Sequence, residues 1–193
     1  MPHLHRLKTS HVNQTDQIIT EKTQNWIRSF IIDLNICPFA RREVERGSVR
    51  IQISSAQSND KALDDLFAET KLLDSTPAVE TTLLVFPHFL SDFYDYLDFV
   101  DWAETNLNLA NYEGVYQLAT FHPDYCFADT DVDDVSNYTN RSPYPMLHLL
   151  RETSVEKAIA YYGNTDEIPE RNIACLNKLG LAEIKKILAG TIL

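Results

Sequence analysis

Two histidines follow apolar runs of the kind that form strands. His88 closely follows the run from Thr81 to Phe86, and His122 directly follows the run from Tyr116 to Phe121. Ligands of open α/β sheets bind beyond the carboxyl ends of strands, where an imidazole is suited to acid–base chemistry. His122 is the stronger candidate for a general acid or base, because a long loop begins there and such loops are commonly functional. A capping or core histidine explains His88 more simply.

The segment 140–152, Asn-Arg-Ser-Pro-Tyr-Pro-Met-Leu-His-Leu-Leu-Arg-Glu, holds the densest group of charged and reactive side chains. Ser142 followed by Pro143 predicts the start of a helix that spans about 143–162. The free N–H groups and partial positive charge of a helix N-terminus suit an anion. Arg141 beside this end would add a bidentate contact to the same anion.

In such a helix His148, Arg151 and Glu152 would share one face, because residues three and four apart are neighbours. We therefore predict that His148 transfers a proton and that Arg151 helps to hold the substrate. A surface ion pair within the helix is the structural alternative. The residues predicted to bind the anionic small molecule are Asn140, Arg141, Ser142 and Arg151.

Helical spacing of apolar residues predicts a first helix between Ile18 and Leu34. Cys37 stands near the predicted end of this helix, directly before Pro38. It would be a nucleophile if a cation such as imidazolium or arginine lay beside it, and otherwise a buried structural thiol. The other cysteines, Cys126 and Cys175, fit structural roles. The three are widely spaced and lack a CxxC pair, which argues against disulfides and a zinc site and favours a reducing cytoplasm.

A metal-dependent variant of this hypothesis would use His122, His148, Glu152 and an aspartate of the long loop, since His148 and Glu152 are four residues apart. The acidic stretch that starts at Asp129 resembles an EF-hand loop but fails, because Asp134 stands where the turn needs glycine. Gly-rich nucleotide motifs and the HExxH zinc motif are absent, so the sequence identifies no cofactor.

Hydrophobic periodicity indicates the elements that would position these residues. The run 49–54 alternates apolar and polar residues, whereas the runs 81–86 and 116–121 are more continuously apolar, and helical spacing of apolar residues fills the intervals. This order predicts an α/β or α+β fold: a small sheet of three or four strands with crossover helices, followed by a helical C-terminal part. The pattern leaves open whether one strand is reversed.

The chain has 193 residues and a net charge of −11. We expect one globular domain over 18–193 after a mobile tail over 1–17. So acidic a surface argues against binding to nucleic acid or anionic membranes, which both require cationic groups. No apolar run approaches the roughly 20 residues of a membrane helix.

Several of these segments together resemble a bacterial family known as domain of unknown function 1415. The resemblance covers about 26–160, and it rests on the segments Leu-Asn-Ile-Cys-Pro-Phe-Ala (34–40), Glu-Thr-Thr-Leu-Leu-Val (80–85), Phe-His-Pro-Asp-Tyr (121–125) with Phe127, and Asn137 through Asn-Arg-Ser-Pro-Tyr-Pro (140–145) to His-Leu-Leu-Arg-Glu (148–152). It implies a small bacterial cytosolic protein and assigns no activity, cofactor or catalytic residue.

Two hypotheses of different classes follow from the sequence. The first is a small enzyme, of hydrolase or transferase type, that acts on an anionic small molecule through His122, His148 and Cys37. The second is a metabolite-binding or adaptor protein without catalysis. Convergence of His122, Arg141, His148 and Arg151 on one concave pocket would favour an enzyme or a ligand-binding protein, and side chains that point apart would favour an adaptor.

Overall fold

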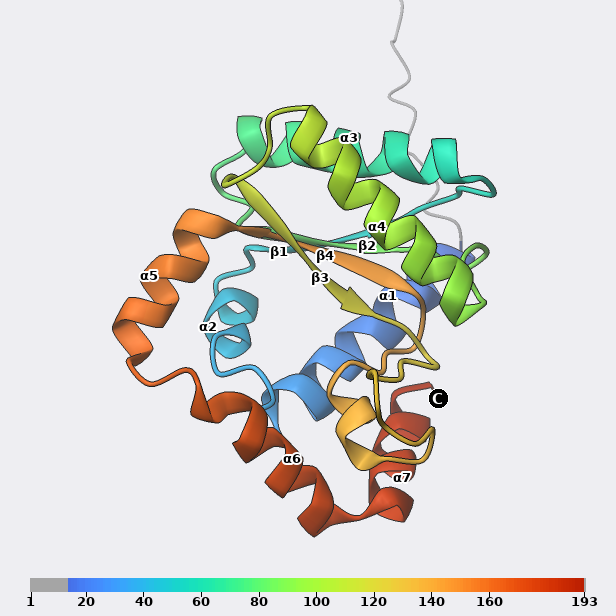
Figure 1. The fold of residues 1–193 in the computed structure, drawn as a ribbon, viewed down its shortest axis with the longest axis vertical. Coiled ribbons are helices and arrows are strands. Elements are labelled where there is room, and N and C mark those ends of the chain that lie inside the picture. The colour runs from blue at the N-terminus through green and yellow to red at the C-terminus, as the bar shows by residue number, and fades with distance from the viewer. Residues whose placement is uncertain (1–13, 193) are drawn as a thin grey trace, which may run out of the picture.

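The computed structural model describes residues 14–192, and every structural statement below concerns these residues. Helices surround one four-stranded sheet (Figure 1). In chain order the elements are α1 (Gln14–Trp26), the π-helix η1 (Ile27–Ile32), α2 (Ala40–Glu45), β1 (Val49–Ile53), α3 (Asn59–Ser75), β2 (Thr81–Val85), α4 (Phe93–Leu109), β3 (Tyr116–Phe121), the 3-10 helix η2 (Val135–Thr139), β4 (Met146–Arg151), α5 (Glu152–Tyr162), α6 (Glu167–Leu179) and α7 (Leu181–Ile192).

The strand order in the sheet is β1-β2-β4-β3. β1 and β2 are parallel and joined by the crossover helix α3, whereas β4 runs antiparallel to both of its neighbours. The fold is therefore mixed α+β with a helical C-terminal part, which confirms the predicted class. It also settles the strand direction that the sequence pattern left open.

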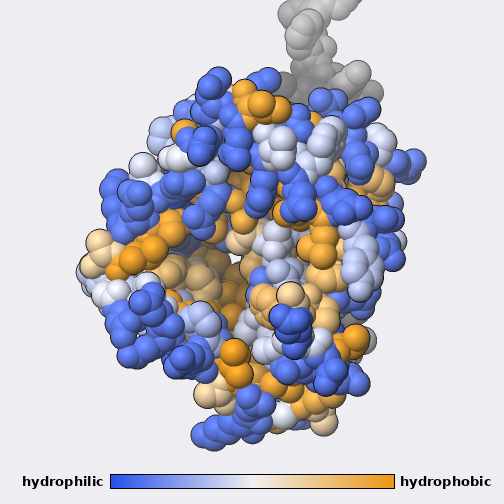
Figure 2. Space-filling view, in the orientation of Figure 1, coloured by the Kyte–Doolittle hydropathy of each residue, from blue (hydrophilic) through white to orange (hydrophobic). Residues whose placement is uncertain are grey.

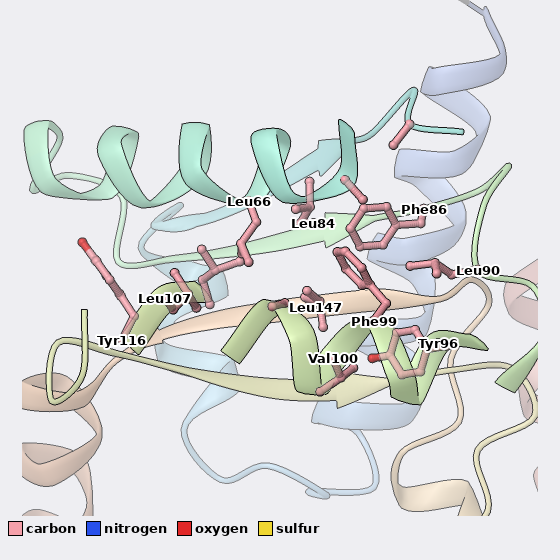
Figure 3. Close-up of a cluster of buried hydrophobic side chains, with 14 of the residues drawn as sticks. Leu66, Leu84, Phe86, Leu90, Tyr96, Phe99, Val100, Leu107, Tyr116 and Leu147 are labelled. Carbon is pink, nitrogen blue, oxygen red and sulfur yellow. The ribbon is translucent and has the colours of Figure 1, made fainter. Parts of the chain in front are cut away.

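Two helices cover one face of the sheet, which we call the closed face. α3 and α4 lie across it (Figure 1), and their apolar side chains interlock with those of the strands in a continuous cluster (Figure 3). Among the strand residues of this cluster, Leu84, Leu147 and Leu149 have no exposed surface. The helices start where the sequence predicts, because Ser58 caps α3 and Asp92 caps α4 with side-chain acceptors for free N–H groups.

The opposite face, which we call the open face, packs against α1, η1, α6 and α7. Its cluster centres on Trp26, Phe30, Val85 and Met146, all buried to 1% exposure or less. The predicted helix from Ile18 to Leu34 is confirmed in type, although it begins at Gln14 and continues as η1. Residues 14–17, predicted as part of a tail, thus belong to α1; residues 1–13 lie outside the described part of the chain.

The predicted helix over 143–162 is wrong in its first half. Residues 146–151 form β4, the strand between β2 and β3, and the helix begins only at Glu152. Leu147 and Leu149 join the closed-face cluster while Met146 joins the open-face cluster. Burial on both faces of a central strand removes the alternation that would identify a strand, so the apolar residues also fitted a helical period.

No helix among the described residues is long and apolar enough to cross a membrane.

Candidate functional site

The strand β4 sends its two candidate side chains to opposite faces of the sheet. Successive strand residues alternate between faces, so His148 lies with Met146 on the open face, whereas Arg151 lies with Leu147 and Leu149 on the closed face. The prediction that His148, Arg151 and Glu152 share a helix face is wrong for this reason. A separation of three residues joins side chains in a helix and separates them in a strand.

The open face is not covered uniformly. Under β2 it is sealed, with Leu83 4% exposed and Val85 fully buried. Under β3 and β4 the burial of this face is uneven, because Met146 is fully buried whereas Ala119, His148 and Leu150 are only half-buried. The helix α5 arches away from the sheet at this point and has no buried residue. Figure 2 shows the surface hollowed between α5, α6 and the sheet, with hydrophobic side chains inside, in the region where Figure 1 places α2; we call this recess the α5 hollow.

His148 is the polar group that the sheet presents on this side. Its Nε2 lies 2.7 Å from the hydroxyl of Thr81, and that hydroxyl lies 2.5 Å from the carbonyl oxygen of Leu149. The hydroxyl has one proton, which it donates to the carbonyl, so it accepts the bond from His148 Nε2–H. The proton of the neutral imidazole is therefore held on Nε2.

The second ring nitrogen of His148, Nδ1, has no hydrogen-bond partner among the described residues. The one fully sealed side-chain polar atom without a partner in this part of the chain is Oε1 of Glu80, so Nδ1 of His148 is not fully sealed from solvent. Burial lowers the pKa of His148 to about 4, which keeps the imidazole neutral at physiological pH. His148 thus offers a free hydrogen-bond acceptor on the half-covered part of the open face.

His122 lies on the other side of the sheet and is fully buried. Its ring packs against Phe93 and Tyr96 of α4, with centroids 5.2 and 5.1 Å away. Nε2 lies 3.1 Å from the Leu90 carbonyl oxygen, and Nδ1 accepts the N–H of Asp124 at 3.0 Å. Burial lowers the pKa of His122 as well. Both ring nitrogens are occupied, so this histidine joins the start of the long loop to α4.

The residues predicted at a helix N-terminus instead hold the long loop together. The Arg141 guanidinium donates to the carbonyl oxygens of Tyr125 and Val132 at 3.0 and 2.8 Å. The Asn140 amide donates to the carbonyl of Thr120, and the Ser142 hydroxyl donates to that of Tyr144. No helix starts at Ser142, so the helix N-terminus on which the predicted anion site depended does not form at this point.

Arg151 forms a structural contact on the closed face. Its guanidinium donates to the carbonyl oxygens of Leu73 and Val79, at 2.6 and 3.1 Å, and to the hydroxyl of Tyr116 at 3.2 Å. These bonds tie the end of β4 to the end of α3 and the turn before β2. The two arginines predicted to hold one anion are therefore each bonded to backbone carbonyls, in different parts of the fold.

Cys37 is half-buried between η1 and α2 and packs against the open-face cluster. Burial raises the pKa of its thiol, although the N–H groups of Phe39 and Ala40 and the charge of Arg171 act in the opposite direction. Arg171 donates to the Asn35 carbonyl at 2.7 Å and to the Tyr162 hydroxyl at 2.9 Å. Burial outweighs the effect of Arg171, so the thiol form dominates at neutral pH.

The structure does not bring His122, His148 and Glu152 together. His122 is on the closed face, His148 is on the open face, and Glu152 is the first residue of α5. Within residues 14–192 no group of three or more His, Cys, Asp or Glu side chains is placed to hold a metal ion. The roles assigned to the individual residues stay predictions, and His148 is the one that lies where the face is half-covered.

With the geometry in place, the comparison with known families decides the relationship. Residues 18–186 match the family described as protein of unknown function (DUF1415). The chain belongs to this family. The match confirms the resemblance found in the sequence and extends it to α6 and α7. No curated protein and no solved structure matches the chain.

Two residues that the sequence reasoning missed act on candidate residues: Thr81 contacts His148, and the charge of Arg171 acts on Cys37. Thr81 fixes the proton of the imidazole, and it was hidden because it belongs to an apolar strand run. Arg171 joins the end of α5 to the segment before Cys37, and no local signal marks it. A strand interpretation of 146–151 would have placed His148 and Arg151 on opposite faces, but pairing with Thr81 depends on the order of strands in the sheet.

Proposed function

We propose that this DUF1415 protein binds a small molecule in the α5 hollow and recognises it through Nδ1 of His148. One observation carries the proposal: the proton of His148 is held on Nε2 by Thr81, while Nδ1 has no hydrogen-bond partner among the described residues and is not fully sealed. Pockets for small molecules are typically concave and apolar, with a few fixed polar groups that orient the ligand. The half-buried side chains around His148, among them Ala119, Phe121 and Leu150, supply the apolar part.

The ligand chemistry follows from the charge state of the imidazole. A histidine with a pKa of about 4 is neutral at physiological pH, and its free nitrogen accepts but does not donate. It therefore complements an O–H or N–H group. A carboxylate or phosphate without a proton would meet the lone pair of Nδ1 and gain no hydrogen bond from it.

This favours a neutral hydroxyl-bearing or amide-bearing ligand over the anion expected from the sequence. Arg141 and Arg151, the cations that were to bind the anion, donate to backbone carbonyls elsewhere. The cation nearest to Cys37 and the end of α5 is Arg171, itself engaged with Asn35 and Tyr162. The side chains predicted to converge, His122, Arg141, His148 and Arg151, lie apart, which argues against a site built from all four. The binding proposed here therefore depends on His148 alone.

A second candidate function is proton transfer at the same nitrogen. The bond from His148 Nε2–H to Thr81 leaves a free nitrogen with a fixed orientation, which is the geometry required of a general base. Because burial lowers the pKa of His148 to about 4, only an acidic O–H or N–H group of a ligand would transfer its proton to Nδ1. This role needs the same ligand contact and adds a chemical step.

A paired-variant binding screen tests the proposal. Neutral phenols and alcohols of one to two rings would be screened by ligand-observed NMR, next to carboxylates of the same shape. His148→Gln keeps an amide that can donate to Thr81 but lacks Nδ1. His88→Gln is the matched control, because His88 is exposed beside the α4 N-terminus.

We expect neutral donors to bind the wild type and to lose about tenfold in affinity in His148→Gln, the equivalent of one hydrogen bond of about 1.4 kcal/mol. His88→Gln should bind as the wild type does. Hits whose affinity is the same in both variants would refute recognition by His148. A preference for carboxylates that survives in His148→Gln would restore the anionic ligand at another site.

A further inference from the structure

Two helices border the α5 hollow without burying any residue of their own. Neither α2 nor α5 contains a buried residue, and Figure 1 shows both on the side of the sheet opposite to α3 and α4. By contrast, α3 and α4 each bury several side chains. The open face is therefore loosely packed at this end, and contacts other than core packing must hold α5 in place.

α5 carries an apolar stripe although it has no buried residue. The stripe follows the i, i+3, i+4, i+7 spacing that places side chains on one face of a helix, and it consists of Val155, Ala158, Ile159 and Tyr162. Ile159 and Tyr162 are 42% and 41% exposed, so much of the stripe contacts water. Tyr161, the neighbour of Tyr162, is 92% exposed and faces solvent.

The contacts of Tyr162 show which way the stripe faces. The ring of Tyr162 packs edge-on against the ring of Phe39, the residue before α2, with centroids 5.6 Å apart. The hydroxyl of Tyr162 accepts a hydrogen bond from the Arg171 guanidinium of α6 at 2.9 Å. Both contacts are made with elements that border the hollow, so the stripe faces α2 and α6.

The partners of Tyr162 are fixed in turn to the segment before α2. Arg171 donates to the carbonyl oxygen of Asn35 at 2.7 Å, and its buried neighbour Asn172 donates to that of Ile36 at 2.8 Å. These bonds join α6 to the segment that leads into Phe39. Through Tyr162, the end of α5 therefore rests on a part of the molecule that is itself held together.

The start of α5 is fixed as well. The N–H of Glu152 donates to the carbonyl oxygen of Val115 at 3.0 Å, directly after the end of β4. Between Glu152 and Tyr162, no hydrogen bond, ion pair or ring contact joins a side chain of α5 to another element within residues 14–192. α5 is thus supported at its two ends only.

The hydrophobic effect acts against this arrangement. The stripe of α5 and the half-buried Ala119 and Leu150 of the sheet border the same recess (Figure 2), and both keep apolar surface in contact with water. A movement of α5 toward the sheet would remove apolar surface from water on both sides, which is favourable. The contacts of Tyr162 with Phe39 and Arg171 oppose this movement at the far end of the helix.

We propose that Tyr162 is a positioning residue that holds α5 away from the sheet and so keeps the α5 hollow open. It sets the width of the hollow, and with it the thickness of the molecule that can enter. The opening itself requires no ligand, whereas its consequence for affinity rests on the function proposed above. Without Tyr162, α5 moves onto the sheet and covers His148.

Solvent access to methyl groups tests the open state without a ligand. Tyr162→Ala removes the ring and the hydroxyl, whereas Tyr162→Phe removes only the bond from Arg171. Tyr161→Ala is the matched control, because this neighbouring ring faces solvent. Broadening of the Ala119 and Leu150 methyl signals by a neutral soluble nitroxide measures how far each methyl group is exposed.

We expect this broadening to fall about twofold or more in Tyr162→Ala and by a smaller factor in Tyr162→Phe, because α5 then covers the sheet. Tyr161→Ala should match the wild type. A Tyr162→Ala protein that keeps its helical circular dichroism and shows equal or stronger broadening overturns the proposal. If Tyr162→Ala loses helix, Tyr162→Phe decides, and unchanged broadening there overturns the proposal instead.

Binding of 2-naphthol, a neutral phenol of two rings, connects Tyr162 to the proposed function. Its affinity should fall about tenfold in Tyr162→Ala, where the hollow is closed, and stay unchanged in Tyr161→Ala. If the wild type does not bind 2-naphthol, that result counts against the proposed function, and the methyl signals still decide the role of Tyr162. If binding depends on His148 but the methyl signals are the same in every variant, the proposed function stands and the role of Tyr162 is refuted.

Discussion

The two faces of the sheet differ in how completely their side chains are buried. On the closed face, strand side chains such as Leu84 and Leu149 are fully buried under α3 and α4. On the open face, the residues of β2 and Met146 of β4 are buried, whereas His148 and Leu150 of β4 remain half-buried. The sheet thus has one face that is closed by two helices and one face that is only partly covered.

Polar groups follow the same division. On the closed face, the buried Glu69 carboxylate accepts from Arg50 and Thr82, and Arg151 donates to two backbone carbonyls. His122 uses both ring nitrogens there. Each of these groups has its partners, as burial requires. His148 alone among the histidines placed within the sheet keeps one nitrogen free. The comparison shows that a reactive residue type indicates a site only where the surrounding packing leaves one of its polar atoms without a hydrogen-bond partner.

The largest expected effect is a difference between the two faces in the stability that is lost when a leucine side chain is shortened. Leu84→Ala removes a fully buried side chain from the closed face and should lower the free energy of unfolding by about 2–5 kcal/mol. Leu150→Ala, the same change at a half-buried position of the open face, should cost less than half as much. Chemical denaturation of both variants measures the two values, and equal losses would remove the distinction between the faces.

A pH-dependent loss of stability should come from the open face. His148 is neutral in the folded protein down to a pKa of about 4, whereas in the unfolded chain it gains a proton below about 6.5. Its contribution to stability is therefore complete above pH 6.5 and is lost as the pH falls toward 4, by at most about 3 kcal/mol.

The variant His148→Gln isolates this contribution. Its free energy of unfolding should fall less than that of the wild type between pH 6.5 and 4. Burial also lowers the pKa of His122, so part of the dependence should persist in the variant. Denaturation curves at several pH values give the comparison, and identical slopes for the two proteins would show that His148 titrates normally.

Arg151→Met should reveal a structural role on the closed face. The change removes charged hydrogen bonds to Leu73 and Val79 and should destabilise the fold by about 1.5–3 kcal/mol. Ligand binding at the α5 hollow should stay within about twofold of the wild type at temperatures where the variant is folded. A variant of normal stability that has lost ligand binding would instead return Arg151 to the binding site.

The smallest expected effect is that of losing the orientation of the His148 ring, as distinct from losing the ring itself. Thr81→Val keeps the shape of the side chain but removes the hydroxyl that fixes the proton on Nε2. Because both imidazole tautomers then become accessible, the affinity for a neutral hydroxyl ligand should fall about threefold to tenfold, less than in His148→Gln. Isothermal titration measures both, and a Thr81→Val protein with full affinity would exclude the orienting role.

The sequence predicted most elements but not the site that they form. Helix caps such as Ser58 and Asp92 and the apolar runs 81–86 and 116–121 were recognisable because their signals are local. The run 146–151 failed because a central strand buried on both faces has no alternating pattern. That one error moved His148 and Arg151 onto a common helix face and produced the predicted anion site.

Other parts of the site were beyond local reasoning. Whether His122 is available depends on the carbonyl of Leu90, which is distant in sequence, and the tautomer of His148 depends on Thr81. Such partners are fixed by the order of strands and by how α4 lies on the sheet. Residue types could therefore nominate His148, but only tertiary structure could separate it from His122.

The protonation of the His148 ring in the folded protein tests the central claim most directly. Two-bond ¹H–¹⁵N correlation spectra of ¹⁵N-labelled protein, recorded from pH 8 to 4 with His148→Gln to assign the ring, report each nitrogen separately. We expect Nε2 to be protonated and Nδ1 to be unprotonated throughout, with a titration only near pH 4. A ring protonated on Nδ1, or one that titrates near pH 6.5, would contradict an acceptor held ready on the open face.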